Sequence, residues 1–159
     1  MIPDSQSASR RLVIGFEGTE PDAAFVDLLR ETGAGGVILF ARNIVDADQT
    51  RALIERLRGL VDWPLLIAVD QEGGPVVRVT KGATVFPGNM ALGAAGDPAL
   101  AEAQGKISGA ELAAMDFDLN LAPVIDLQTN PANPGIGLRS FAADRAEARA
   151  LAEGYVRGH

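Results

Sequence analysis

Short apolar runs alternate along this chain with longer segments in which apolar residues recur at helical spacing. The short runs predict strands, because each is bounded by polar or turn-forming positions and is too brief for a stable helix. The longer segments predict helices, and several begin at an aspartate that can cap the first turn. The expected strands cover residues 12–16, 36–40, 65–69 and 119–124, and the expected helices cover residues 21–33, a stretch after Asp46, about 97–116 and 142–157.

Turn-forming residues mark the ends of these expected helices. Pro21 suits the first turn of the first helix, and Gly33 is expected to stop it. Asp97, followed by a proline, is the start signal of the third helix, and Gly158 is expected just beyond the last one. The pattern therefore predicts a regular succession of strands and helices along the chain.

The expected strands are continuously apolar, which is typical of parallel strands buried on both faces by helices. Four strand–helix units in sequence predict an α/β fold with right-handed crossovers. An open doubly wound sheet and a TIM barrel both fit, and both place functional sites in loops after the carboxyl ends of strands. Residues 70–96 and 126–141 are two such loops. Residues 1–11 are expected to be a flexible terminus, and residues 12–159 one folded unit.

The composition excludes several kinds of catalytic and metal site, and it says less about the fold. The 159 residues include no cysteine, and the single histidine is His159. A thiol nucleophile, a Ser-His-Asp triad and a histidine metal site are therefore not expected, and we expect no metal and no cofactor. The formal net charge is −7, which disfavours binding to nucleic acid or to an anionic membrane. The lack of cysteine and of an apolar signal segment fits a cytoplasmic location.

Polar residues stand directly after the expected strands, where a parallel sheet would gather them on one rim. A charged group there must be solvated, paired or bound to a ligand. The sharpest feature is Asp70-Gln71-Glu72-Gly73-Gly74, whose glycines permit a tight turn that presents a carboxylate outward. Such a carboxylate can accept hydrogen bonds from sugar hydroxyls, act as an acid or base, or bind a metal. The strand-end residues are Glu17, Arg42, Asn43, Asp70, Gln71, Glu72 and Asp126.

Two arginines are candidate partners for a bound polar ligand. Arg78 follows shortly after Asp70, and turn-forming residues deliver Arg139 to a defined place in the second long loop. Structural alternatives stay open for all three residues. Asp70 could cap amides of its own loop, and Arg78 could form a surface ion pair. Arg139 could be tied to Asp126 or Asp144.

Four ordered segments together form a recognisable pattern. They are Gly35-Gly-Val-Ile-Leu-Phe-Ala-Arg-Asn43, then Asp70-Gln-Glu-Gly-Gly74 followed by Val76-Val77-Arg78, then Ala122-Pro-Val-Ile-Asp126, and finally Leu138-Arg-Ser-Phe141. In this order they resemble the β-N-acetylhexosaminidases of glycoside hydrolase family 3, from about residue 12 to the last residue. The resemblance implies a TIM-type (β/α)8 barrel, of which this sequence is the N-terminal portion of about four strand–helix units.

The same resemblance implies a function. It implies a cofactor-free, retaining hydrolase that removes terminal β-linked N-acetylglucosamine from a small sugar or muropeptide-type substrate. By position, Asp70, Arg78 and Arg139 match the sugar-binding residues of that family. Pro75 replaces an arginine that is usual there, and Asp116 stands where glycine is commoner.

The catalytic segments of that family do not occur in these 159 residues. They are a Lys-His-Phe-Pro-Gly-His-Gly segment, an Asp–His acid/base pair and an aspartate nucleophile. The resemblance therefore assigns part of the sugar-binding site to this sequence and no catalytic residue, so that the chain alone is expected to be inactive.

Two other functions fit parts of the pattern. A non-catalytic sugar-binding or scaffolding half-barrel would keep Asp70, Arg78 and Arg139 without turnover. An unrelated α/β phosphate or nucleotide binder is disfavoured, because no phosphate-binding glycine motif occurs. If these residues are the whole polypeptide, two open parallel sheet edges are expected to make it self-associate or leave it only marginally stable.

Overall fold

A four-stranded parallel sheet forms the centre of the protein, in a computed structural model that describes residues 8–159. The strands follow the order β1-β2-β3-β4, so that each crossover brings the chain to the neighbouring position. This sequential parallel order is the arrangement of strands in a (β/α) barrel, and it confirms the expected α/β fold. The strands are β1 (Val13–Ile14), β2 (Gly36–Leu39), β3 (Leu66–Val69) and β4 (Leu119–Asn120).

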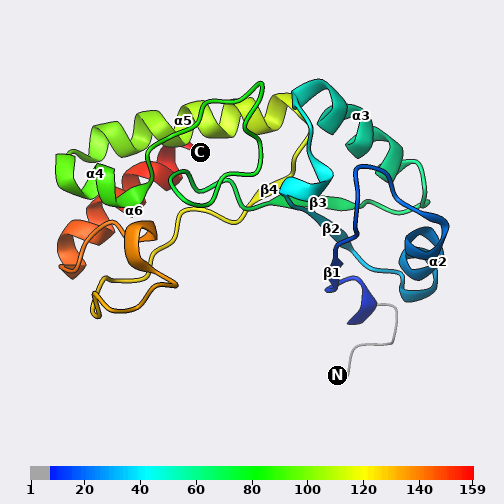
Figure 1. Ribbon diagram of the computed structural model, residues 1–159, viewed down its shortest axis with the longest axis horizontal. Helices are drawn as coiled ribbons and strands as arrows, with labels where there is room; N and C mark the ends of the chain where they lie inside the picture. Colours follow the sequence, from blue (N-terminus) through cyan, green and yellow to red (C-terminus); the bar gives the residue numbers. More distant parts are fainter. Residues whose placement is uncertain (1–7) are drawn as a thin grey trace.

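The helices lie along the outer side of an arch, and the strands and the loop after β4 lie on its inner side (Figure 1). Most apolar residues of β2 and β3 are almost fully buried beneath α2 and α3, among them Val37, Leu39 and Ile67. Leu66 is exposed and Ile38 is only half-buried, so the expected burial on both faces of the sheet is incomplete. The helical segments are α2 (Ala23–Thr32), η1 (Ala41–Asn43), α3 (Ala47–Arg58), α4 (Asn89–Ala95), α5 (Pro98–Ala114), η2 (Gly137–Arg139) and α6 (Arg145–Gly158).

Aspartate caps set the starts of the four longer helices. In each case the carboxylate accepts a hydrogen bond from a backbone N–H of the first turn, which would otherwise lack a partner. The α2 helix begins after Asp22, so that Pro21 lies before the cap and not in the first turn. Gly33 ends α2 with a φ of 63°, as expected of a helix-stopping glycine. The capping residues are Asp22, Asp46, Asp97 and Asp144.

Two apolar clusters hold these elements together. The larger one packs α2, α3 and the end of α5 against the sheet, around Leu29, Ile54 and Ile67. The smaller one packs α4, α5 and α6 together, around Leu151 and Tyr155. Val69 and Val79, which lie just before and just after the segment of candidate site residues that follows β3, belong to the larger cluster.

Four elements differ most from the expected pattern. The β1 strand covers only Val13–Ile14 of the expected residues 12–16. The α4 helix lies within the expected loop 70–96; it is short and follows Gly88, which offers no side-chain cap. The β4 strand covers only Leu119–Asn120 of the expected residues 119–124, although the Leu121 N–H still donates to the Val69 carbonyl at 2.8 Å. Gly158 belongs to α6 and does not lie beyond it.

The expected flexible segment 1–11 falls partly outside the described residues, which begin at residue 8. Within the described part, the Arg10 guanidinium stacks on the Trp63 ring at 4.0 Å from its centroid. Flexibility of this terminus stays a prediction.

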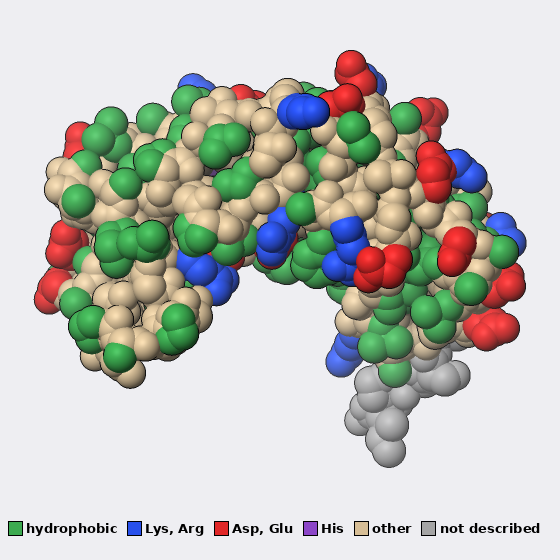
Figure 2. Space-filling model, viewed as in Figure 1, with side chains coloured by type: hydrophobic (Ala, Val, Ile, Leu, Met, Phe, Trp, Pro, Cys, Tyr) green, Lys and Arg blue, Asp and Glu red, His purple; other side chains and the backbone are tan. Residues whose placement is uncertain are grey.

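The space-filling view shows the arch hollowed on its inner side, with Lys and Arg side chains along the edge of the hollow (Figure 2). Between residues 8 and 159, no helix combines the length and the apolar character needed to cross a membrane.

Candidate functional site

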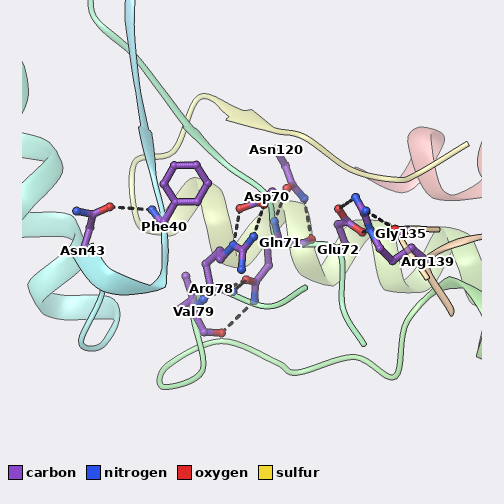
Figure 3. A network of polar contacts seen from close by, with 10 residues as sticks. All are labelled: Phe40, Asn43, Asp70, Gln71, Glu72, Arg78, Val79, Asn120, Gly135 and Arg139. Atoms are coloured by element: carbon purple, nitrogen blue, oxygen red, sulfur yellow. Dashed lines mark hydrogen bonds and ion pairs between the residues drawn. The ribbon is translucent and has the colours of Figure 1, made fainter. Parts of the chain in front are cut away.

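The first part of the site is an ion pair between Asp70 and Arg78 (Figure 3). Asp70 follows β3 directly, at the carboxyl end of a parallel strand. Its two carboxylate oxygens each accept one hydrogen bond, from Arg78 Nε at 2.6 Å and from Nη2 at 2.5 Å. The side chains are 18% and 25% exposed, so that both are still accessible to a ligand. The hydrogen bond to Asp70 raises the pKa of Arg78, although burial lowers it.

Gln71 fixes the backbone on which Arg78 stands. The Gln71 amide oxygen accepts from the backbone N–H groups of Arg78 at 2.7 Å and Val79 at 3.0 Å, and its amide nitrogen donates to the Val79 carbonyl. Asn120, the last residue of β4, in turn holds both backbone groups of Gln71. Because Gln71 is buried, this chain of amides holds the returning segment firmly against the end of the sheet.

The second part is an ion pair between Glu72 and Arg139, which are 67 residues apart in the sequence. Arg139 Nε and Nη2 donate to the two Glu72 oxygens at 2.8 and 2.7 Å, and Nη1 donates to the Gly135 carbonyl at 2.8 Å. The hydrogen bond to Glu72 raises the pKa of Arg139, although burial lowers it. The buried side chain of Asn89, in α4, donates to the Arg139 carbonyl at 2.8 Å and anchors this loop from below.

The two ion pairs interact electrostatically. The Glu72 carboxylate acts to raise the pKa of Arg78, and the Asp70 carboxylate acts to raise that of Arg139. Each guanidinium therefore lies within the field of both carboxylates. The structure brings all three residues expected to bind a ligand onto one rim and adds Glu72 to them.

These contacts identify the partners of the three residues, and Arg78 does form an ion pair; the ligand-binding role of Asp70, Arg78 and Arg139 stays a prediction. Asp70 binds the Arg78 guanidinium and does so with both oxygens. Arg139 is tied to Glu72; Asp126 contributes only a longer-range attraction, and Asp144 caps α6. The partner of Arg139 was missed because a glutamate in a polar segment after a strand gives no sign that it will be buried.

The other expected strand-end residues line the neighbouring part of the rim. Arg42 forms an ion pair with Glu17 at 3.2 Å, and its guanidinium lies 4.7 Å from the centre of the Phe40 ring. The buried Asn43 side chain donates to the carbonyls of Phe16 and Gly18, and so links the ends of β1 and β2. Within residues 8–159, no group of three or more His, Cys, Asp or Glu side chains is arranged to hold a metal ion.

Comparison with known families identifies the family of proteins to which this site belongs. A family model described as the glycosyl hydrolase family 3 N-terminal domain matches residues 10–159. The chain belongs to glycosyl hydrolase family 3. The expectation drawn from the four ordered motifs is thereby confirmed.

Curated beta-hexosaminidases resemble the chain over most of its length. A beta-hexosaminidase from Tolumonas auensis is 41% identical over 149 residues, and one from Haemophilus ducreyi is 40% identical over 152 residues. Each alignment covers 92% of this chain and 44% of the relative. The chain thus spans less than half the length of these curated relatives.

Solved structures of family 3 members superpose closely on this fold. A family 3 β-N-acetylglucosaminidase from Paenibacillus sp. str. FPU-7 is 40% identical with a TM-score of 0.91, over 99% of this chain and 31% of that one. NagZ from Neisseria gonorrhoeae, in complex with N-trifluoroacetyl-D-glucosamine, is 30% identical with a TM-score of 0.84, over 92% of this chain and 47% of that one. The likeness confirms that the four strand–helix units are those of the family 3 N-terminal barrel.

Proposed function

We propose that this chain provides the part of a β-N-acetylhexosaminidase that binds the terminal sugar. The reaction is the retaining removal of terminal β-linked N-acetylglucosamine from a small sugar or a muropeptide-type substrate. The family and the names of the relatives support a hexosaminidase, and the structure of one neighbour holds an N-acylated glucosamine. The observation that carries the proposal for this chain is the convergence of Asp70, Arg78 and Arg139 on one rim.

The hydrogen-bonding capacity of these residues suits a hydroxyl-rich ring. A carboxylate offers about four acceptor sites, and the Arg78 bonds occupy one on each Asp70 oxygen. The remaining lone pairs can accept from two neighbouring sugar hydroxyls, while free N–H groups of both arginines donate to ring substituents. Hydrogen bonds to ionised groups are roughly twice as strong as neutral ones.

Turnover requires more than these residues supply. Retaining hydrolysis needs a nucleophile and an acid/base carboxyl group about 5–5.5 Å apart on either side of the scissile bond. Here both oxygens of Asp70 and of Glu72 are engaged by arginines, an arrangement that suits binding and orientation. We therefore infer that the 159 residues bind the sugar but do not hydrolyse its glycosidic bond unaided.

The test is a titration of the chain with N-acetylglucosamine, followed by NMR or calorimetry. We expect saturable binding by the unaltered chain, and an affinity about ten- to a hundredfold lower for Asp70→Asn, because one strong charge-assisted contact is lost. No cleavage of a chromogenic β-N-acetylglucosaminide is expected in either case.

The control is Glu153→Gln, which alters an exposed ion pair with Arg149 within α6. It is expected to bind the sugar like the unaltered chain. Failure of the unaltered chain to bind even at high millimolar sugar would refute the proposal. The comparisons do not favour a non-catalytic sugar-binding or scaffolding protein, because the relatives named above are hexosaminidases or glucosaminidases.

A further inference from the structure

Glu72 differs from its neighbour Asp70 in how far solvent can reach it. Its side chain is only 4% exposed, whereas that of Asp70 is 18% exposed. A buried carboxylate needs a partner, because an isolated charge away from water is strongly disfavoured. Glu72 has that partner in Arg139, which contacts both of its oxygens and is itself 33% exposed.

We propose that Glu72 is a positioning residue, which orients Arg139 toward the sugar without contacting the sugar itself. This inference rests on the proposed function. Asp70 and Glu72, which lie in the same short segment, then have different roles. Asp70 stays accessible and accepts hydrogen bonds from the ligand, while Glu72 acts only through the guanidinium that it holds.

The placement of the Glu72 carboxylate is itself fixed. The Glu72 N–H donates to the Val76 carbonyl at 2.9 Å, and Gly73 pairs with Val76 in a small antiparallel bridge. The φ of Gly73 is 89°, and a Cβ there would crowd the Phe86 carbonyl at 3.1 Å, so that glycine permits this tight turn. The carboxylate therefore stands on a backbone that cannot easily shift.

Arg139 depends on this anchor for its direction. Three of the five guanidinium N–H groups are engaged, two by Glu72 and one by the Gly135 carbonyl. The other two stay available to a ligand. Because Glu72 lies after β3 and Arg139 lies in the loop between β4 and α6, the ion pair also joins the two long loops of the site. Without it, the arginine would sample several side-chain rotamers, and each binding event would have to order it.

The test compares Glu72→Gln with the unaltered chain. Glutamine has nearly the shape of glutamate but carries no charge, and its NH2 group would face the guanidinium. We expect N-acetylglucosamine to bind about tenfold more weakly, a factor typical of losing one charged hydrogen-bond partner. We also expect the Arg139 Nε–H resonance to lose its protection from solvent exchange, while that of Arg78 is unchanged. Arg139→Lys, which lacks Nε, assigns the resonance.

A double-mutant cycle separates positioning from a general structural effect. If Glu72 acts through Arg139, then Glu72→Gln should weaken binding little or not at all when Arg139 is already lysine. Glu153→Gln again serves as the control for removing a carboxylate from an ion pair, and should leave affinity and the Arg139 resonance unchanged.

The outcomes are distinct. Unchanged affinity of Glu72→Gln, or full additivity with Arg139→Lys, would overturn the role of Glu72 while the proposed function stands. Absence of sugar binding by the unaltered chain would refute the proposed function, and the sugar role of Glu72 with it. Coupled losses of affinity and of the protected resonance would support both.

Discussion

At the scale of single residues, three consecutive side chains after β3 organise the whole candidate site. Asp70 holds the Arg78 guanidinium, Gln71 holds the Arg78 backbone, and Glu72 holds Arg139. The sequence predicted the two arginines and Asp70 as binding residues. It did not predict Glu72 as a partner, because pairing across such a long stretch of chain leaves no mark on the local pattern.

Asp116 carries a backbone conformation that L-residues seldom adopt. Its φ is 67°, and it ends α5 with the two hydrogen bonds of a Schellman turn, from Asp116 N to the Ala113 carbonyl and from Phe117 N to the Leu112 carbonyl. Glycine adopts this left-handed conformation without steric strain. A non-glycine residue there carries a steric cost of roughly 1 kcal/mol.

We predict that Asp116→Gly raises the free energy of unfolding by roughly 0.5–1 kcal/mol. The change relieves the left-handed strain and removes only an exposed ion pair with Arg51, 3.4 Å long, which contributes little. Urea denaturation measures the effect, and Arg51→Ala gives the contribution of the ion pair separately. A loss of stability in Asp116→Gly would contradict this account of the position.

At the scale of elements, α5 and α6 approach each other through glycines. A Cβ on Gly105 would collide with the Tyr155 carbonyl, and one on Gly154 would lie 2.5 Å from the Pro98 carbonyl. A Cβ on Gly158, the last residue of α6, would collide with the Glu102 carbonyl, so this glycine also permits the close approach of the two helices. Glycine here serves close packing, a role that sequence position alone does not distinguish from helix termination.

We predict that Gly105→Ala lowers the free energy of unfolding by roughly 1–3 kcal/mol, because the two helix backbones must move apart to admit the methyl group. Gly59→Ala is the matched control. Gly59 has a φ of −72°, and a Cβ there would meet its nearest neighbour at an ordinary 3.4 Å. The control should be neutral or slightly stabilising. Equal effects of the two substitutions, measured by thermal unfolding, would show that the close approach is unimportant.

At the scale of the whole molecule, the sheet has two outer strands. In the part of the chain that the structure describes, β1 pairs only with β2, and β4 pairs only with β3. Large apolar side chains are exposed at and after β4, among them Leu119, Leu121 and Ile125. Open parallel edges with apolar neighbours favour pairing with another chain.

We predict that the 159-residue chain, studied by itself, self-associates in a concentration-dependent manner. Leu121→Lys should reduce this association, because a charge at the exposed edge opposes strand pairing, and the half-exposed side chain of Leu121 makes the folding cost small. Sedimentation velocity measures both. A monomeric chain with a sharp, cooperative thermal transition would count against the prediction.

Much of the fold could be read from local patterns because the physics that forms the elements is local. Continuous apolar runs predicted the parallel strands, and aspartates predicted the starts of helices. The pattern placed Asp70 and Arg78 on the rim because both are close in sequence to the end of β3. The pattern did not predict α4, whose start at Gly88 carries no side-chain cap and which packs against α5, α6 and η2.

The sequence by itself determined the α/β class, the position of the carboxylate after β3 and, through its ordered motifs, the family. Only the tertiary structure decided which carboxylate holds which arginine, and that Glu72 is buried while Asp70 stays accessible. The reason is physical. Strand and helix formation depend on residues a few positions apart, whereas the ion pair between residues 72 and 139 forms only once the crossover from β3 to β4 has brought their two loops together.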